Sequence, residues 1–176
     1  GRTLGIVGFG RIGQAVARRA HHGFGMRVLA CARRPIAAEV LAETGAVAAT
    51  DLESLLASAD IVSLHLPLSA DTRHLLDAEA IGRMQRHAVL INTARGEIVD
   101  EAALAAALHA GTLGGAGLDV FEHEPRIHPR LLAAPNTVLL PHLGSATEET
   151  RTAMGLRAVE NLRAFFRGDA PPDRVA

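Results

Sequence analysis

The sequence contains no lysine, tyrosine or tryptophan, and only one cysteine, Cys31, in 176 residues. Without lysine there is no Walker-type P-loop, which places that residue on a phosphate, and no enzyme that forms a Schiff base through a lysine amine. The absence of both tyrosine and lysine also excludes oxidoreductases that work through a tyrosine–lysine pair. A lone cysteine forms no disulfide within the chain, which favours a reducing compartment.

The chain also lacks a strong net charge and a long apolar run. Its net charge is −1, which gives no electrostatic reason to expect a nucleic acid or an anionic membrane as partner. There is no secretory signal and no run of about 18 apolar residues, so we expect a cytoplasmic protein. Hydrophobic residues make up 48% of the sequence, enough for one domain with a real core. Because the chain opens on an apolar run without an initiator methionine, we expect it to be a fragment of a longer protein.

A glycine-rich turn near the start organises the rest of the chain. A short apolar run typical of a buried parallel strand is followed by Gly8, Gly10 and Gly13, where an amphipathic segment begins. In this G-x-G-x-x-G pattern the first glycine allows a tight turn, the second lets a pyrophosphate approach the backbone, and the third allows close helix–strand packing. The N–H groups at the helix start suit phosphate binding. Taken alone the pattern is weak, because many glycine-rich turns bind nothing.

Apolar runs alternate with helical segments along the remaining chain. Further strands are predicted at 26–30, 46–48, 61–64, 88–92, 115–120 and 137–140, and helices at 36–44, 50–58, 78–86, 101–109 and 147–167. Gly45 is a suitable C-cap, Thr50 and Glu53 have capping-box spacing, and Asp100 is a suitable N-cap. This alternation predicts an α/β fold, a doubly wound parallel sheet of the Rossmann type with helices on both faces.

Polar residues that follow predicted strands are candidate site residues, because ligands of a doubly wound sheet bind at the carboxyl ends of its strands. The candidates are Arg33 with Arg34, His65, Arg95, Asp119 with Glu124, and His142. The guanidinium of Arg95 suits a planar carboxylate, although its position also fits a structural salt bridge. A single histidine among nine is more often a surface or core residue than a catalyst. No metal site is expected, since no histidine pair has H-E-x-x-H spacing.

Taken together, five segments resemble the nucleotide-binding domain of the D-isomer-specific 2-hydroxyacid dehydrogenases. They are residues 8–13, 62–68, 91–96, 117–125 and 141–147, and they cover nearly the whole chain in the family's order. The resemblance implies an NAD(P)-dependent oxidoreductase that transfers a hydride between the cofactor and a small 2-keto or D-2-hydroxy acid. It implies a triad in which Arg95 binds the substrate carboxylate, His142 is the acid/base and Glu124 orients the imidazole and favours its charged form.

The same resemblance implies a set of cofactor contacts, including a hydrogen bond from the nicotinamide carboxamide to Asp119. The set is Gly8, Gly10, Arg11, Ile12, Gly13, Arg33, Arg34, Leu66, Pro67, Thr72, Thr93, Ala94, Asp119 and Gly144. It further implies a homodimer and a separate substrate domain. Residues 1–168 would then be the dinucleotide-binding domain and 169–176 a linker toward that absent domain. Alone, the domain is expected to bind dinucleotide but to turn over poorly.

The residues after the second predicted strand bear on the choice of dinucleotide. About 20 residues after the glycines, an acidic side chain normally binds the ribose 2′-hydroxyl of NAD. Here Ala32 occupies that position and Arg33 and Arg34 follow. Guanidinium groups bind a 2′-phosphate, which a carboxylate would repel. NADP(H) is therefore favoured over NAD(H), in a pattern that resembles the glyoxylate/hydroxypyruvate reductase branch. The structural alternative is two solvated arginines at a helix start.

Two other functions are compatible with these residues. One is a non-enzymatic, dinucleotide-sensing module similar to the corepressors that resemble these dehydrogenases. The other is a phosphite-oxidising relative, in which the same type of triad handles an inorganic anion. An assay of the full-length protein with 2-keto acids, phosphite and both cofactors separates them.

Overall fold

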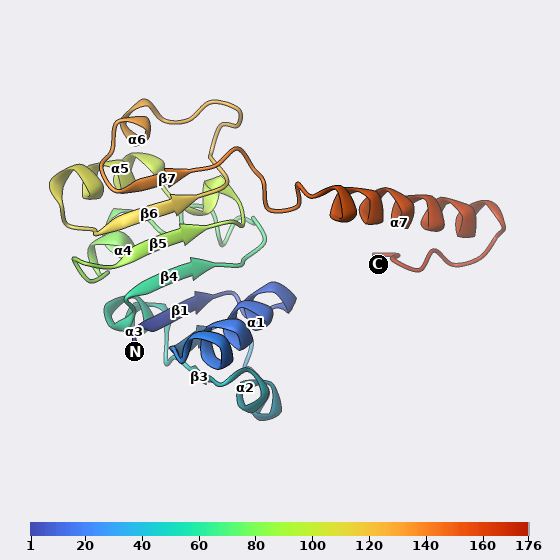
Figure 1. Ribbon diagram of the computed structural model, residues 1–176, viewed down its shortest axis with the longest axis horizontal. Helices are drawn as coiled ribbons and strands as arrows, with labels where there is room; N and C mark the ends of the chain where they lie inside the picture. Colours follow the sequence, from blue (N-terminus) through green and yellow to red (C-terminus); the bar gives the residue numbers. More distant parts are fainter. Residues whose placement is uncertain (176) are drawn as a thin grey trace. The chain divides into compact units, whose positions relative to one another are not determined.

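The computed structural model describes residues 1–175 and divides into two compact units, Gly1–Pro141 and the segment from residue 142 onward (Figure 1). The first unit holds a seven-stranded sheet in the order β3-β2-β1-β4-β5-β6-β7, in which every neighbouring pair is parallel. The strands are β1 (Thr3–Val7), β2 (Arg27–Cys31), β3 (Ala46–Ala48), β4 (Ile61–Leu64), β5 (Val89–Asn92), β6 (Gly115–Leu118) and β7 (Thr137–Leu139). The strand order reverses between β1 and β4, which confirms the predicted doubly wound, Rossmann-type sheet.

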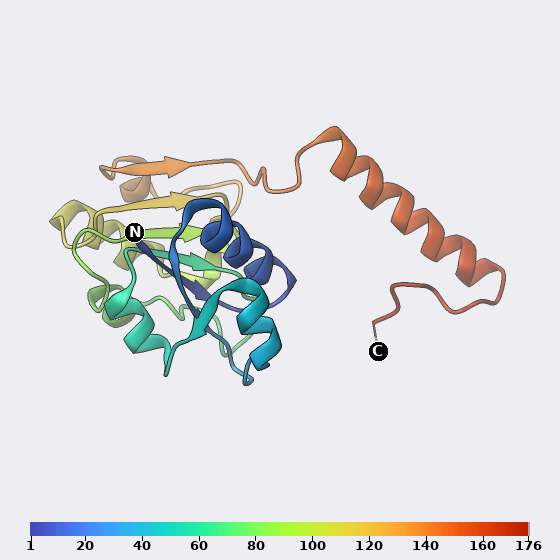
Figure 2. The ribbon, with the colours of Figure 1, turned by 60° about the horizontal axis from the view of Figure 1, so that its bottom comes forward.

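Helices cover both faces of this sheet, because successive side chains of each strand point to opposite faces (Figures 1 and 2). The helices of the first unit are α1 (Arg11–Arg18), the π-helical turn η1 (Arg19–Gly23), α2 (Ala38–Thr44), α3 (Leu52–Ser58), α4 (Ala78–Gly82), the 3-10 turn η2 (Gly96–Ile98), α5 (Glu101–Ala110) and α6 (Pro129–Leu132). Leu4 and Ile6 of β1 pack with α1 and α2 in one cluster. Val7 packs in the other cluster, with α3, α4 and α5.

The start of α3 differs from the prediction by one residue. The N-cap is Asp51, whose carboxylate accepts from the Ser54 N–H (2.7 Å), while the Ser54 hydroxyl accepts from the Asp51 N–H (3.3 Å). The capping box therefore joins Asp51 and Ser54, and the predicted pair of Thr50 and Glu53 is wrong. The backbone hydrogen bond from Ser54 lowers the pKa of Asp51 below its ordinary value. Glu53 instead forms an ion pair with Arg83.

Other element ends also differ from the sequence prediction. The helix predicted over 78–86 ends at Gly82, and the strand predicted over 115–120 ends at Leu118, level with the last paired residue of β7. The short elements η1, η2 and α6 were not predicted, because a single helical turn has too few residues to show a period. The predicted caps at Gly45 (φ 66°) and Asp100, which accepts from the Ala103 N–H (2.9 Å), are confirmed.

The second unit is built on α7 (Glu148–Phe166), close to the predicted helix 147–167. The Thr147 hydroxyl caps it by accepting from the Thr150 N–H (3.2 Å). The segment after α7 folds back on the helix: Arg157 donates to both oxygens of the Asp173 carboxylate (2.5 and 2.8 Å), and Asn161 donates to the same group (2.7 Å). The linker expected from residue 169 therefore has its own contacts, and the boundary at residue 168 stays a prediction. None of the described helices has the length and apolar composition needed to span a membrane.

Candidate functional site

The glycine-rich turn lies where the strand order reverses, between the ends of β2 and β4. The Gly8 N–H donates to the Cys31 carbonyl (2.9 Å), and the His65 N–H donates to the Val7 carbonyl (2.8 Å). Gly8 has a φ of +94°, and a Cβ there would lie 2.5 Å from the His65 carbonyl oxygen. Both the backbone angle and the close approach require glycine at this position, which confirms the predicted tight turn.

The other two glycines of the turn have separate tasks. A Cβ at Gly13 would lie 2.3 Å from the Gly8 carbonyl oxygen, so only glycine lets α1 approach the turn this closely. A Cβ at Gly10 would meet nothing within 4 Å, and Gly10 lines a cavity. Among the described residues no side chain caps the start of α1, so its first N–H groups, which lack partners within the helix, border this open space. The turn fits the pyrophosphate of a dinucleotide.

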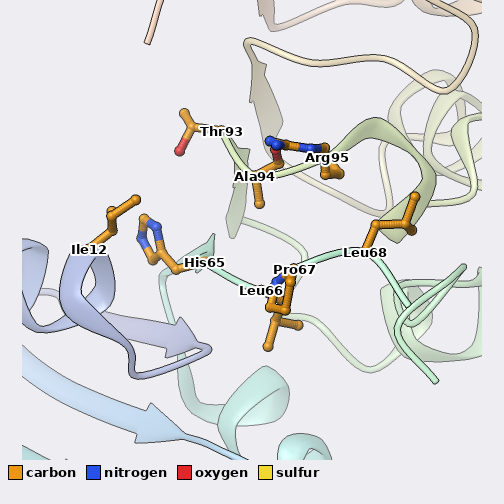
Figure 3. A pocket seen from close by; sticks show the side chains of 8 residues that line it. All are labelled: Ile12, His65, Leu66, Pro67, Leu68, Thr93, Ala94 and Arg95. Atoms are coloured by element: carbon orange, nitrogen blue, oxygen red, sulfur yellow. The ribbon is translucent and has the colours of Figure 1, made fainter. Parts of the chain in front are cut away.

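Two cavities adjoin the turn and share Ile12, His65 and Pro67. The smaller, of about 420 Å³, is lined by Ile12, His65, Leu66, Pro67, Leu68, Thr93, Ala94 and Arg95 (Figure 3). The larger, of about 850 Å³, is lined by Gly10, Arg11, Ile12, Ala15, Val16, Arg19, His65 and Pro67. Most of the residues expected to contact a cofactor in the first unit therefore line the hollow formed by these two adjoining cavities. Ile12 is 68% exposed beside it, so an apolar side chain is available to a ligand there.

His65 is the titratable residue common to both cavities. Its Nε2 lies 2.9 Å from the Ser63 hydroxyl, which is buried in β4. Partial burial lowers the pKa of the imidazole below its ordinary value. The lowered pKa favours the neutral imidazole, so His65 gives both cavities a polar wall.

Arg95 stands at the rim of the smaller cavity, directly after β5. The buried side chain of Asn92 shapes the turn, since its Nδ2 donates to the Arg95 carbonyl (2.8 Å) and its Oδ1 accepts from the Ala94 N–H (3.0 Å). The guanidinium is exposed and folds back to donate to the Ala94 carbonyl (2.6 Å), as Figure 3 shows. A guanidinium has five N–H groups, and this contact uses one of them.

The loop between β6 and α6 carries Glu124, which is exposed and whose Oε1 accepts from the Phe121 N–H (3.1 Å). This loop touches the turn that carries Arg95. A Cβ at Gly96 would lie 1.9 Å from the Phe121 carbonyl carbon and 2.3 Å from the Glu122 nitrogen. The structure therefore brings the Arg95 and Glu124 segments into direct backbone contact, although they are far apart in the sequence.

The remaining expected cofactor residues of the first unit lie outside the cavity lining. Asp119 is buried at the end of β6, and its N–H donates to the Asn92 carbonyl (3.0 Å). The Thr72 hydroxyl donates to the Pro67 carbonyl and accepts from the Ser69 N–H, both at 2.8 Å, so it also shapes its own loop. Arg33 and Arg34 are exposed and follow the end of β2.

His142 and Gly144 belong to the second unit, where both are exposed. His142 has a φ of +57°, a left-handed conformation that is uncommon for a residue with a side chain. Such conformations cluster at functional positions. The contacts of the first unit bring together the segments of Arg95 and Glu124. The role of His142 stays a prediction. Within the described part of the chain, no group of three or more histidine, cysteine, aspartate or glutamate side chains could hold a metal ion.

Comparison with known proteins decides the family. A family model described as "D-isomer specific 2-hydroxyacid dehydrogenase, NAD binding domain" matches residues 1–144. The chain belongs to this family. The assignment confirms the resemblance carried by the five sequence segments, and it identifies the glycine turn as part of an NAD-binding domain.

Relatives of this dehydrogenase domain include three named reductases. The chain is 49% identical to "Glyoxylate reductase" of Thermococcus litoralis, over 99% of this chain and 52% of that protein. It is 53% identical to "Glyoxylate/hydroxypyruvate reductase B" of Klebsiella pneumoniae, over 99% of this chain and 54% of that protein. A solved NADPH-dependent glyoxylate/hydroxypyruvate reductase of Sinorhizobium meliloti has a TM-score of 0.86 and 42% identity, over 94% of this chain and 50% of that one. The chain spans about half the length of these relatives.

Two residues that shape the site of this dehydrogenase domain were not predicted from the sequence. Asn92 was seen only as the end of an apolar strand, yet its amide builds the turn before Arg95. Glu101 was seen only as part of a helix start, yet it is 4% exposed. A polar residue at the end of an apolar strand was a usable signal for Asn92. The burial of Glu101 depends on a loop 20 residues further along and had no local signal.

Proposed function

We propose that this chain is the cofactor-binding half of an enzyme that uses NAD(P)H to reduce a small 2-keto acid, with glyoxylate and hydroxypyruvate as the first substrates to test. One observation carries the proposal: Arg95 lines the same cavity as Ile12 at the start of α1. A guanidinium suited to a carboxylate therefore borders the hollow next to a turn suited to a dinucleotide. The named relatives act, by name, on glyoxylate.

The residues of the chain then have separate tasks. Arg95 binds the substrate carboxylate through two parallel hydrogen bonds and holds the keto group in place. The nicotinamide, when bound, supplies the hydride. His142 donates a proton to the forming alkoxide, and Glu124 orients the imidazole and favours its protonated form. The family resemblance and the left-handed backbone of His142 support this assignment.

The function is tested by assaying the full-length protein with a panel of 2-keto acids, with phosphite, and with both NADH and NADPH. Reduction of glyoxylate or hydroxypyruvate is the expected result. Oxidation of phosphite without keto-acid reduction would favour the phosphite-oxidising alternative. Dinucleotide binding with neither reaction would favour a sensing module. The homodimer implied by the resemblance is checked on the same protein by sedimentation.

In the full-length protein, Glu124→Gln is expected to lower the pH at which keto-acid reduction declines and to reduce kcat about 10- to 100-fold. A carboxylate beside the proposed proton donor stabilises its charged form, and the uncharged amide does not. Rates for glyoxylate reduction between about pH 5 and pH 9 measure the change. Glu39→Gln, at an exposed site on α2, is the control and should leave the profile unchanged. An unchanged profile in Glu124→Gln would remove Glu124 from this role.

We also propose that the domain prefers NADP(H). The Cys31 carbonyl accepts from the Gly8 N–H, so the end of β2 contacts the glycine turn. Arg33 and Arg34 come two and three residues after Cys31 and therefore lie near that turn. Arg33 lies 3.8 Å from the Asp71 carboxylate, and the two side chains are 84% and 80% exposed. An ion pair this exposed contributes only about 0–1 kcal/mol, so it leaves the guanidinium available to a phosphate.

The preference is tested with the double substitution Arg33→Ala and Arg34→Ala. The dissociation constant for NADPH is expected to rise about 10- to 100-fold, because two charge-assisted contacts to the 2′-phosphate are lost. The dissociation constant for NADH should change little. Arg27→Ala, at the opposite end of β2, is the matched control. Equal affinity of the unsubstituted protein for NADH and NADPH in a fluorescence titration would contradict the proposal.

A further inference from the structure

A buried carboxylate lies beside the loop that carries Glu124 and is not among the residues assigned to the proposed reaction. Glu101 is the first residue of α5 and is 4% exposed. Its Oε1 accepts from the Glu122 N–H (2.7 Å) and its Oε2 from the His128 N–H (3.3 Å). One side chain therefore bridges two backbone amides at the two ends of the loop that contains Glu124.

The peptide between Phe121 and Glu122 is where this loop meets its neighbours. The Phe121 N–H binds the Glu124 carboxylate, and the next N–H along the chain, that of Glu122, binds Glu101. The backbone of Gly96, directly after Arg95, packs against the same peptide. A Cβ added at Gly96 would lie only 1.9 Å from the Phe121 carbonyl carbon. The segments that carry Arg95 and Glu124 therefore meet at Phe121 and Glu122, and Glu101 holds the Glu122 N–H from the side of α5.

The chemistry of this contact requires a carboxylate. Each oxygen of Glu101 accepts from a different N–H, and the position at the start of α5 favours negative charge. A glutamine keeps one acceptor oxygen, but its amide NH₂ then faces a backbone N–H donor. The side chain of Glu122 is held separately by His74, and that of His128 caps α6. Glu101 is thus the group that joins the two ends of the loop.

We propose that Glu101 is a positioning residue, which holds the Phe121–Glu122 peptide so that Glu124 keeps its place relative to Arg95. The proposal rests on the proposed function, because it assigns Glu101 a task in the reaction through Glu124. It also makes a claim about the loop alone: without the Glu101 carboxylate, residues 121–128 lose the contact that joins their two ends.

The experiment compares Glu101→Gln, Glu124→Gln and the double substitution in the full-length protein. Glu101→Gln is expected to lower kcat about 10-fold, to shift the pH profile in the direction seen for Glu124→Gln, and to leave NADPH affinity unchanged. The double substitution should lose little more than Glu124→Gln alone, since both act through one carboxylate. Losses in kcat that multiply would overturn the proposal.

Two further measurements separate positioning from simple destabilisation. Asp100→Ala removes the adjacent cap of α5, which binds the Ala103 N–H, without touching the loop. Asp100→Ala should lower the stability of the domain and leave the pH profile unchanged. When it is combined with Glu124→Gln, the two effects on kcat should be independent, so that the double variant has the product of the two single effects. Glu101→Asp keeps two acceptors on a shorter stem and should restore part of the rate; a rate no better than that of the glutamine variant would count against the proposal.

Hydrogen exchange tests whether Glu101 holds the loop of residues 121–128, and it needs no catalytic activity. Deuterium uptake of residues 121–128 is expected to rise in Glu101→Gln and to stay unchanged in Asp100→Ala. If the unsubstituted protein reduces no keto acid, the proposed function fails, whereas the exchange result still reports on the loop. Unchanged exchange in Glu101→Gln would overturn the positioning role even in an active enzyme.

Discussion

Replacing Arg95 with leucine in the full-length protein is expected to lower kcat/KM for glyoxylate about 10²- to 10³-fold. A bidentate, charge-assisted contact to a carboxylate in a partly enclosed site accounts for about 3–4 kcal/mol, and each 1.36 kcal/mol is tenfold in rate. The Arg95 side chain is exposed and lines the cavity, and its guanidinium donates to the carbonyl of the neighbouring Ala94, so its loss should not unfold the domain. Steady-state kinetics over a range of glyoxylate concentrations measure the effect.

Two comparisons make the Arg95 result specific. Arg95→Lys keeps the charge but not the planar pair of donors, so it should recover only part of the lost kcat/KM. Arg73→Leu, at an exposed loop position outside the cavity lining, should leave kcat/KM unchanged. NADPH affinity should be the same in all three variants. If Arg95→Leu retains the original kcat/KM, the guanidinium does not bind the substrate.

Gly96→Ala is expected to destabilise the domain by about 3 kcal/mol or more. The added Cβ would lie 1.9 Å from the Phe121 carbonyl carbon and 2.2 Å from its oxygen. Both atoms belong to the backbone, so no change of side-chain rotamer relieves the overlap. The loop that carries Glu124 must move away from the turn that carries Arg95. Urea unfolding followed by circular dichroism measures the loss.

The matched control for this prediction is Gly82→Ala. Gly82 is the last residue of α4, and a Cβ there would meet nothing within 4 Å. Because alanine is the better helix former, the control should be neutral or stabilising by up to about 1 kcal/mol. If the two variants unfold at the same urea concentration, the close packing of Gly96 against the Phe121–Glu122 peptide is not present in solution.

Much of the fold was predictable because its signals are local. Alternating apolar runs and helical segments indicate βαβ units, and Gly45 and Asp100 mark helix ends through their own backbone and side-chain chemistry. The glycine spacing predicted the turn at the switch point for the same reason. The one wrong cap, Thr50 with Glu53, shows the limit of such signals, since two overlapping patterns lay one residue apart and Glu53 instead pairs with Arg83, the residue that follows α4.

The sequence by itself determined the Rossmann-type sheet, the glycine turn and the family, because these depend on the order and local chemistry of residues along the chain. The tertiary structure decided which segments support one another. Glu101 reads as an ordinary acidic residue at a helix start until the loop at 122–128 covers it, and Gly96 reads as a turn residue until the Phe121–Glu122 peptide lies against it. Both contacts join residues more than 20 positions apart, and their geometry follows from how parallel strands align at one edge of the sheet.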